Sequence, residues 1–459
     1  MEQIINYIRS QRPQHLAELF QLLRIPTVST DPQHAGDVAA CSQFLADHLR
    51  VIGLKTVKIL PTAGHPVVYA EWLEAPGAPT VLVYGHYDVQ PPEPLELWES
   101  PPFAPEIRAG EIYARGASDD KGQFFAHVKA IEAYLRQEGK LPVNLKLLIE
   151  GEEEIGSAHL HTFVTQHAAL LQADAIIISD TNLFAPGVPT ICYGTRGLVA
   201  AQIDVQGAAR DLHSGDFGGL AANPIQVLAN ILAALKDQND RVTIPGFYDD
   251  VAALTKAEQR QFAALPFDLE ALKAEIGVTE LAGEKGFTPL ERRWARPTLE
   301  INGMAGGFIG EGMKTIIPAK AMAKVTMRLV PHQDPDKIFR AFEAHVHRLT
   351  PAAVTVQVTG DTHGKAYLTP LTHPVLPFIS KALRQVFRRD PVFIRTGGTI
   401  GVVSTFAETL HAPVIFVGLS QPNDNAHAPN EHLNEAAFYT GIEVAAQLLH
   451  ELKEWKPES

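Results

Sequence analysis

Residues 81–88, Val81-Leu82-Val83-Tyr84-Gly85-His86-Tyr87-Asp88, join a short apolar run to a glycine, a histidine and an aspartate. Two similar apolar runs follow: residues 145–149 lead into Glu150-Gly151-Glu152-Glu153-Glu154, and residues 175–178 lead into Ser179-Asp180. Short apolar runs that end in polar or glycine-rich turns are typical of buried parallel or mixed strands. Because residues 123–136 and 160–167 have helical spacing between these runs, we predict an α/β sheet with helices on both faces.

The pattern changes after Gly194-Thr195-Arg196-Gly197 and returns at Pro370. Between these points the chain has the pattern of a strand-helix-strand-strand-helix-strand unit, with strands at 198–205, 321–329 and 353–358 and helices at 223–235 and 336–349. From Pro370 onward the α/β pattern resumes, with helices at 378–387 and 435–452 and a strand at 414–417. We therefore predict one α/β domain made of residues 1–196 and 367–459, interrupted by an inserted α+β domain at residues 197–366.

Composition narrows the classes of protein that this chain can represent. Thirty-nine basic and 52 acidic residues give a net charge of −13, which disfavours nucleic acids and anionic membranes as partners. No run of 18 apolar residues is present, and the early acid Glu2 argues against a signal peptide. Two cysteines, Cys41 and Cys192, are too few for a disulfide framework. We expect a cytoplasmic protein with reduced thiols.

Polar residues follow the predicted strands, where ligands bind in open α/β sheets. The histidines and carboxylates at or near these strand ends include His86, Asp88, Asp119, Asp120, Glu152, Glu153, Glu154, Asp180, Asp424 and His427. Any one alone fits a surface turn or a helix cap. Together they bring imidazoles and carboxylates to one sheet edge without a thiolate, which suits zinc, manganese or cobalt. A carboxylate that bridges two such ions would hold them about 3.5–4 Å apart.

The spacing of these residues indicates further roles. His86 and Asp88 can share one face of an extended chain, so that Asp88 can fix the tautomer of His86. Glu153 and Glu154 are neighbours at a strand end. One of them can bind metal while the other holds the attacking water as a general base.

The combined set resembles the co-catalytic di-zinc peptidases. That family includes carnosinase-type and cytosolic non-specific dipeptidases, glutamate carboxypeptidase, acetylornithine deacetylase, succinyl-diaminopimelate desuccinylase and aminoacylase. The resemblance runs in order from Gly85-His86-Tyr87-Asp88 to Ala426-His427. It implies a zinc-peptidase-like mixed sheet sandwiched by helices, with the inserted domain acting as a lid and pairing two subunits in a homodimer. It also implies two divalent metal ions per subunit, with zinc favoured over manganese or cobalt.

The resemblance implies a role for each residue that matches a family motif. It assigns two ligands to each metal and one bridge: His86 with Asp180, Glu154 with His427, and Asp119 between them. A cis peptide is expected after the bridging Asp119. Glu153 is expected to be the general base, and Asp88 is expected to orient His86.

The inserted domain carries further motifs of this resemblance. Asp211-Leu212-His213-Ser214-Gly215 resembles the lid motif, in which His213 would stabilise the oxyanion in the partner subunit's site. Arg328 would hold the terminal carboxylate of the substrate through its fork of N–H donors, with Thr315 assisting. The same end of the substrate would meet the backbone N–H groups of a loop formed by Gly397, Gly398 and Thr399.

The expected reaction is hydrolysis of a dipeptide, or of a short peptide with a free C-terminal carboxylate. Tyr193-Gly194-Thr195-Arg196-Gly197 and the long stretch after Leu235 resemble the dipeptidase branch, although Thr396 stands where close dipeptidases tend to have Glu. An N-acyl amino acid hydrolase and a carboxypeptidase are the alternatives. A phosphoesterase is disfavoured by the lack of a basic groove, and a metal-bound dimeric binding module by Glu153, which binding alone does not need.

Overall fold

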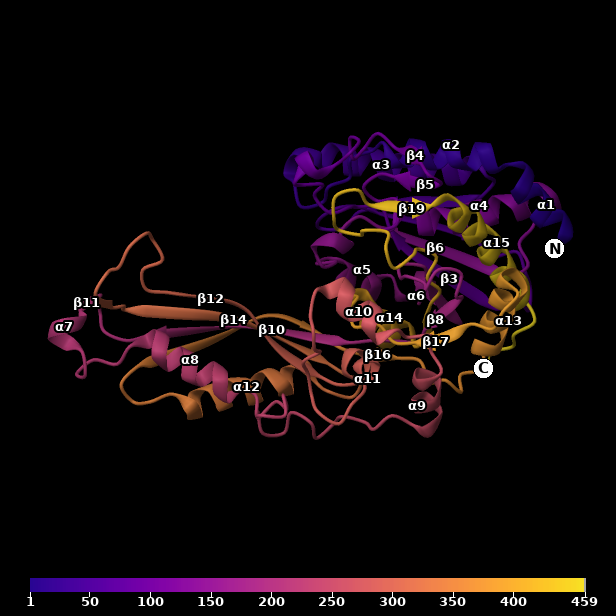
Figure 1. Cartoon of the computed structure of the whole chain (residues 1–459). Helices are drawn as coiled ribbons and strands as arrows, with labels where there is room; N and C mark the ends of the chain where they lie inside the picture. The colour runs from indigo at the N-terminus through magenta and orange to yellow at the C-terminus, as the bar shows by residue number, and fades with distance from the viewer. Residues whose placement is uncertain (458–459) are drawn as a thin grey trace. The chain divides into compact units, whose positions relative to one another are not determined.

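The computed structural model describes residues 1–457, apart from the side chains of residues 361–363, and it contains two compact units (Figure 1). The first unit consists of Met1–Tyr193, Thr369–Ile394 and the chain from Gly401 on. The second unit consists of Gly194–Leu368 and Arg395–Ile400. No described helix is both long enough and apolar enough to cross a membrane.

The boundaries of the two units differ from the predicted domain boundaries, most of all at Arg395–Ile400. The inserted segment begins at Gly194 rather than at 197 and ends at Leu368 rather than at 366. Arg395–Ile400, which we predicted to belong to the first domain, is part of the second unit. Backbone hydrogen bonds explain this, because the N–H of Thr396 donates to the Gly194 carbonyl at 2.8 Å and the N–H of Arg196 donates to the Gly398 carbonyl at 3.0 Å.

An eight-stranded mixed sheet forms the centre of the first unit. Its order is β1 (Thr56–Leu60), β2 (Val67–Trp72), β6 (Asn144–Glu150), β3 (Thr80–His86), β7 (Ala175–Ile178), β18 (Val414–Phe416), β8 (Thr190–Cys192) and β17 (Val392–Ile394). The strands β6, β3, β7 and β18 are neighbours and run parallel. Their carboxyl ends therefore meet at one edge of the sheet.

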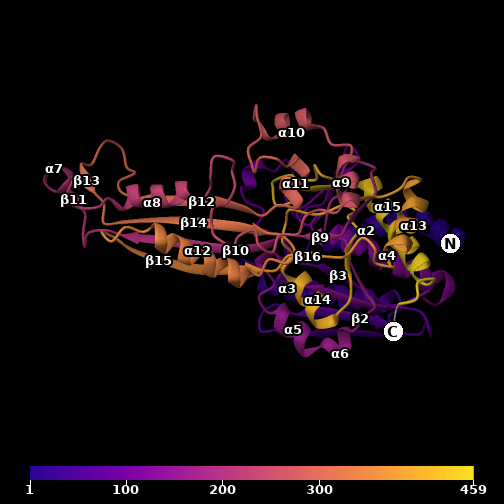
Figure 2. The ribbon, with the colours of Figure 1, turned by 90° about the horizontal axis from the view of Figure 1, so that it is seen from below.

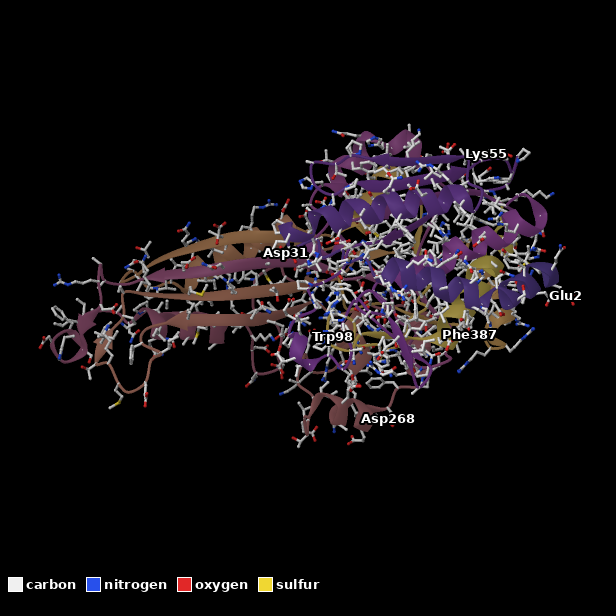
Figure 3. The ribbon with its side chains drawn as sticks, turned by 90° about the horizontal axis from the view of Figure 1, so that it is seen from above. Glu2, Asp31, Lys55, Trp98, Asp268 and Phe387 are labelled. Carbon is white, nitrogen blue, oxygen red and sulfur yellow. The ribbon has the colours of Figure 1, made fainter. Side chains whose placement is uncertain are left out.

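Helices cover both faces of this sheet, as the sequence predicted. One group comprises α1 (Glu2–Ser10), α2 (Arg12–Leu23), α3 (Ala35–Val51), α4 (Lys121–Glu138), α13 (Leu376–Phe387) and α15 (Glu435–Leu452). The other comprises α5 (Leu160–Gln166), α6 (Ala168–Leu171) and α14 (Gly401–Leu410). Figure 2 shows β2 and β3 between α4 and the α5–α6 pair. Apolar side chains from the sheet and the first group fill the space between them (Figure 3).

A small antiparallel sheet in the first unit corrects one sequence interpretation. Asp119 was expected near the end of a strand of the main sheet. The strand that precedes it, β5 (Glu111–Tyr113), instead pairs with β4 (Glu106–Arg108) and β19 (His432–Asn434) in a separate sheet. Asp119 therefore reaches the edge of the main sheet from a loop that leads directly into α4.

The second unit contains a four-stranded antiparallel sheet with helices on one face. The strands lie in the order β12 (Thr298–Gly306), β14 (Lys320–Leu329), β10 (Gly197–Gln206) and β15 (Thr355–Gly364). Every second residue of β10 is buried, because α8 (Pro224–Ala234) and α12 (Pro335–Leu349) pack on that face (Figure 1). The edge strand β12 was not predicted, because most of it is exposed and its residues do not alternate between buried and exposed.

Shorter elements complete the second unit. Two small ladders pair β11 (Leu212–His213) with β13 (Ile316–Ile317), and β9 (Gly194–Thr195) with β16 (Tyr367–Leu368). The remaining helices are α7 (Ser214–Phe217), α9 (Lys256–Ala263), α10 (Leu269–Ile276) and α11 (Pro289–Trp294). The last three lie in the long stretch after Leu235, whose charged sequence has little periodicity.

Candidate active site

His86 is the last residue of β3, and its ring is fully buried beside two carboxylates. Its Nε2 lies 3.1 Å from Asp119 Oδ1 and 3.8 Å from Asp180 Oδ2. The preceding Gly85 makes this close approach possible, since a Cβ there would lie 2.5 Å from the Phe124 Cβ and 2.8 Å from Asp120 Oδ2. Asp180 arrives from the end of the neighbouring parallel strand β7.

His427 faces the other oxygen of the same aspartate. Its Nε2 lies 2.8 Å from Asp119 Oδ2 and 3.2 Å from Glu154 Oε2. Glu154 follows β6 in a single 3-10 turn, Glu153–Ile155. Asp119 thus presents one carboxylate oxygen to each histidine, which is the arrangement that a bridging ligand needs.

The structure brings together all five residues that the sequence singled out as metal ligands. They form two groups that share Asp119, and within each group the ligand atoms lie within 4.8 Å of one another: His86, Asp119 and Asp180 in one, and Asp119, Glu154 and His427 in the other. Two imidazoles and three carboxylates, without a thiolate, form a donor set that suits zinc, manganese or cobalt.

The electrostatics of the cluster show why cations fit there. Burial, with the charge of Asp119 second, raises the pKa of Asp180 to about 6. Burial also raises the pKa of Glu153 well above its ordinary value. Hydrogen bonds to Asp119 and Glu154 raise the pKa of His427 to about 10. Several carboxylates therefore share a desolvated space, and divalent cations would supply the positive charge that offsets their repulsion.

Asp88 holds the turn of Glu153 and Glu154 as well as lying near His86. Its Oδ1 accepts a hydrogen bond from the N–H of Glu153 at 3.2 Å, and its Oδ2 accepts from the N–H of Glu154 at 3.0 Å and from the Ser29 hydroxyl at 2.8 Å. The Nδ1 of His86 lies 3.1 Å from the Asp88 carbonyl oxygen but 3.5 Å from Oδ1. The nearer acceptor for the His86 ring is therefore the main-chain carbonyl of Asp88. We had expected the carboxylate of Asp88 to be that acceptor.

Glu431 is a buried residue of the site that sequence reasoning missed. It accepts hydrogen bonds from the Arg115 guanidinium at 2.7 Å, from the N–H groups of Gly116 and Ser118 at 3.0 Å each, and from the N–H of Asp119 at 3.1 Å. The loop that it holds contains the expected cis peptide between Asp119 and Asp120. No local pattern could have revealed this contact, because 316 residues separate Arg115 from Glu431.

In the second unit, Arg328 and the glycine-containing loop lie together. The guanidinium of Arg328 donates through Nη1 to the Thr399 hydroxyl at 2.7 Å. Arg196 donates through Nε to the Gly397 carbonyl at 3.0 Å. The N–H of Gly398 donates to the Thr396 hydroxyl at 3.2 Å, so this group already has an acceptor within the loop.

Thr315 lies beside His213 and not beside Arg328. His213 is paired with Ile316 across the β11–β13 ladder, and the N–H of Ser214 donates to the Thr315 carbonyl at 3.0 Å. Arg328 lies near the far end of β14, about 25 Å away along the strand at the usual rise of a β-strand. Within one chain Thr315 therefore does not reach Arg328, and its assistance to Arg328 stays a prediction.

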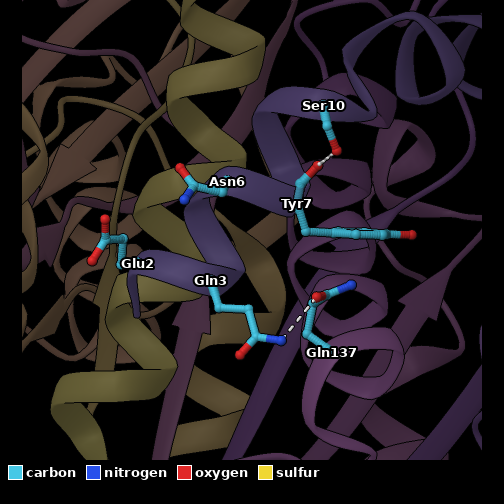
Figure 4. A pocket seen from close by; sticks show the side chains of 6 residues that line it. All are labelled: Glu2, Gln3, Asn6, Tyr7, Ser10 and Gln137. Carbon is cyan, nitrogen blue, oxygen red and sulfur yellow. Dashed lines mark hydrogen bonds between the residues drawn. The ribbon is translucent and has the colours of Figure 1, made fainter.

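An open hollow elsewhere in the first unit is unrelated to this chemistry. It measures about 590 Å³ and is lined by Glu2, Gln3, Asn6, Tyr7, Ser10 and Gln137. Figure 4 shows its walls, in which Gln3 donates to Gln137 at 3.2 Å and the Ser10 hydroxyl donates to the Tyr7 carbonyl at 2.8 Å. None of these residues belongs to a group of potential metal ligands in the described chain, so the hollow is not a second candidate for the metal site.

Fold and site together define a metal-dependent hydrolase built on a mixed α/β sheet. Comparison with known proteins agrees: the chain belongs to peptidase family M20/M25/M40, whose model matches residues 82–451. It is 31% identical over 476 residues to the Cys-Gly metallodipeptidase dug1 of Schizosaccharomyces pombe, covering 100% of this chain and 99% of the relative.

Two further relatives span nearly the whole chain. The Beta-Ala-His dipeptidase of Homo sapiens is 30% identical over 471 residues, covering 98% of this chain and 92% of the relative. The solved structure of the M20 family metallo-carboxypeptidase Sso-CP2 from Sulfolobus solfataricus has a TM-score of 0.87 and 33% identity, covering 96% of this chain and 99% of that one. The enzyme is thus similar to both dipeptidases and a carboxypeptidase.

Proposed function

We propose that this enzyme hydrolyses the peptide bond of dipeptides, or of short peptides with a free C-terminal carboxylate, with two divalent metal ions bound around Asp119. The observation that carries the proposal is that Asp119 offers one oxygen to each of two ligand groups. Glu153 lies next to a member of one group without belonging to either. Zinc is the proposed metal, with manganese and cobalt as alternatives.

The metals, bound as His86 with Asp180 and Glu154 with His427, would polarise the substrate carbonyl and lower the pKa of a water molecule. Glu153 accepts a proton from that water and returns it to the leaving amine. Asp88 fixes the position of Glu153 through its N–H, at 3.2 Å from Oδ1.

The second unit is proposed to bind the substrate and stabilise the transition state. Arg328 forms a paired hydrogen bond with the C-terminal carboxylate, and the loop of Gly397, Gly398 and Thr399 surrounds the same end of the peptide. His213 of the partner subunit donates to the oxyanion of the tetrahedral intermediate.

A homodimer formed through the second unit is part of the proposal. The edge strand β12 and the segment that follows it expose large apolar side chains: Ile301, Met304, Phe308, Ile309 and Met313. Ile309 and Met313 are 94% and 97% exposed, which is unusual for residues of this type unless another surface covers them. His213 is also exposed and is available to a partner. We place the enzyme in the cytoplasm, where Cys41 and Cys192 would stay reduced.

The first experiment is a substrate panel, run with zinc, manganese and cobalt. It compares dipeptides with longer peptides and with acetylated and succinylated amino acids. Preferred turnover of dipeptides supports the proposal. Preference for longer peptides would favour the carboxypeptidase reading, which the similarity to Sso-CP2 supports, and preference for acylated amino acids would favour an N-acyl amino acid hydrolase.

A substitution separates catalysis from metal binding. Glu153→Gln is expected to retain two metal ions per chain and to lose at least about a hundredfold in kcat, the lower range for removing a general base. Metal content is measured by elemental analysis alongside turnover. If the variant keeps substantial activity, Glu153 is not the base.

A further inference from the structure

Two arginines of the second unit, Arg196 and Arg328, lie close together on one face of its sheet. Arg328 of β14 is directly opposite Leu198 of β10, and Arg196 lies two residues before Leu198 on the same side of the chain. Side chains in such diagonal positions come within about 7–8 Å of each other. Thr399 links them, because its hydroxyl accepts from the Arg328 guanidinium and donates to the Arg196 carbonyl, both at 2.7 Å.

These two arginines lack the carboxylate partners that some other arginines of the second unit have. Three others in the same unit form ion pairs with buried glutamates: Arg241 and Arg296 with Glu284, and Arg395 with Glu258. Among the described residues, neither Arg196 nor Arg328 has a carboxylate within 4.0 Å. An arginine that is partly withdrawn from water is normally paired, so the missing partner indicates an anion that arrives from outside the unit.

The charges around Arg196 and Arg328 support the interpretation that they bind an external anion. Burial, followed by the charges of Arg328 and Arg293, lowers the pKa of Arg196 to about 10. Glu300 is the one acid that acts in the opposite direction among the named influences, and it is itself 3.5 Å from Lys236. The adjoining segment Arg395–Ile400 contains no acidic residue. Positive charge therefore exceeds negative charge at this end of the sheet.

A single carboxylate would form an ion pair with one arginine and leave the other arginine without a counterion. The proposed function assigns the α-carboxylate of the substrate to Arg328. Arg196 uses only its Nε, which donates to the Gly397 carbonyl at 3.0 Å, and its two terminal nitrogens have no acceptor among the described residues. Those two nitrogens form a free donor pair of the kind that binds a carboxylate with two hydrogen bonds.

Resting on the proposed function, we propose that the preferred substrates are peptides that end in glutamate or aspartate. The α-carboxylate binds Arg328, and the side-chain carboxylate binds the terminal nitrogens of Arg196. Such a substrate supplies the second negative charge that the arginine pair lacks.

The test compares Ala–Glu with Ala–Gln, which have nearly the same shape and differ by one charge. In the unaltered, metal-loaded enzyme, kcat/KM for Ala–Glu should exceed that for Ala–Gln by about tenfold or more, the scale of a half-exposed charge-assisted hydrogen bond. The ratio should fall as salt is added. Arg196→Gln should bring the ratio close to one, whereas Arg260→Gln, which removes an exposed charge of α9, should leave the ratio unchanged.

The outcomes separate this inference from the proposed function. Turnover of both dipeptides at equal rates would overturn the inference and keep the proposed function, as would an unchanged ratio in Arg196→Gln. If neither dipeptide is cleaved, the proposed function fails, and binding decides the inference. L-glutamate should then bind more tightly than L-glutamine in calorimetry, and equal affinities would overturn the inference. The same binding comparison applies if Arg196→Gln does not fold.

Discussion

Replacing the buried Glu431 by glutamine should damage the metal site without touching a metal ligand. In the structure Glu431 Oε2 accepts from Arg115 and from the N–H of Gly116, while Oε1 accepts from Asp119 and from the N–H and hydroxyl of Ser118. Glutamine keeps one acceptor oxygen, so its NH₂ group must face one of these two sets of donors.

The expected loss of stability follows from the arginine charge that remains buried. Arg115 is 1% exposed, and Glu431→Gln leaves its charge without a counterion, a change that typically costs about 3–5 kcal/mol. The N–H of Asp119 also depends on Glu431, so the loop that carries the bridging aspartate should lose its position. Metal affinity should then fall by about 10–100-fold, the usual effect of removing a group that supports a ligand.

Urea unfolding and calorimetric titration with zinc measure the two effects. Asp47→Asn is the matched control, since Asp47 pairs with Arg50 at 2.7 Å on the surface, and it should change neither quantity detectably. Adding Arg115→Met to Glu431→Gln should restore part of the lost stability, because the unpaired charge disappears. The reasoning is refuted if Glu431→Gln unfolds within about 1 kcal/mol of the parent and binds zinc equally well.

Three other predictions concern the first unit. Asp119→Asn should reduce binding of both metals and Asp180→Asn chiefly of one, measured as ions per chain by elemental analysis; equal losses would contradict the bridging role. Gly85→Ala should destabilise the protein by about 1–3 kcal/mol, because its Cβ would meet Phe124, whereas Gly36→Ala has open space and should be neutral or stabilising. Burial, then the charge of Lys129, lowers the pKa of His15 to about 4. Since the unfolded chain binds this proton near pH 6.5, the unfolding free energy should fall as pH drops from about 6.5 to 4, and His15→Phe should reduce that dependence; an unchanged slope would exclude His15 as a contributor.

The sequence identified the candidate metal ligands because each lies either at the end of an apolar run or in a recognisable motif. Apolar runs with polar endings identified β3, β6 and β7, and parallel strands must bring such endings to one edge. His427 and Asp119 were recognised through motifs rather than periodicity. The edge strand β12 was not predicted because its exposure removes the apolar–polar alternation on which strand prediction depends.

Contacts between distant segments were beyond the reach of local patterns. Glu431 supports Asp119 across 312 residues, and the Arg395–Ile400 segment joins the second unit through hydrogen bonds to residues about 200 positions earlier. The register of β10 with β14 sets Arg196 beside Arg328.

Sequence by itself determined the α/β class and the donor set that is proposed to bind metal, because strand endings and side-chain types are properties of short segments. Tertiary structure alone decided which groups support those donors and which arginines remain unpaired. The physical reason is that burial and hydrogen bonding depend on strand register and on contacts between segments distant in the sequence, which no short segment specifies.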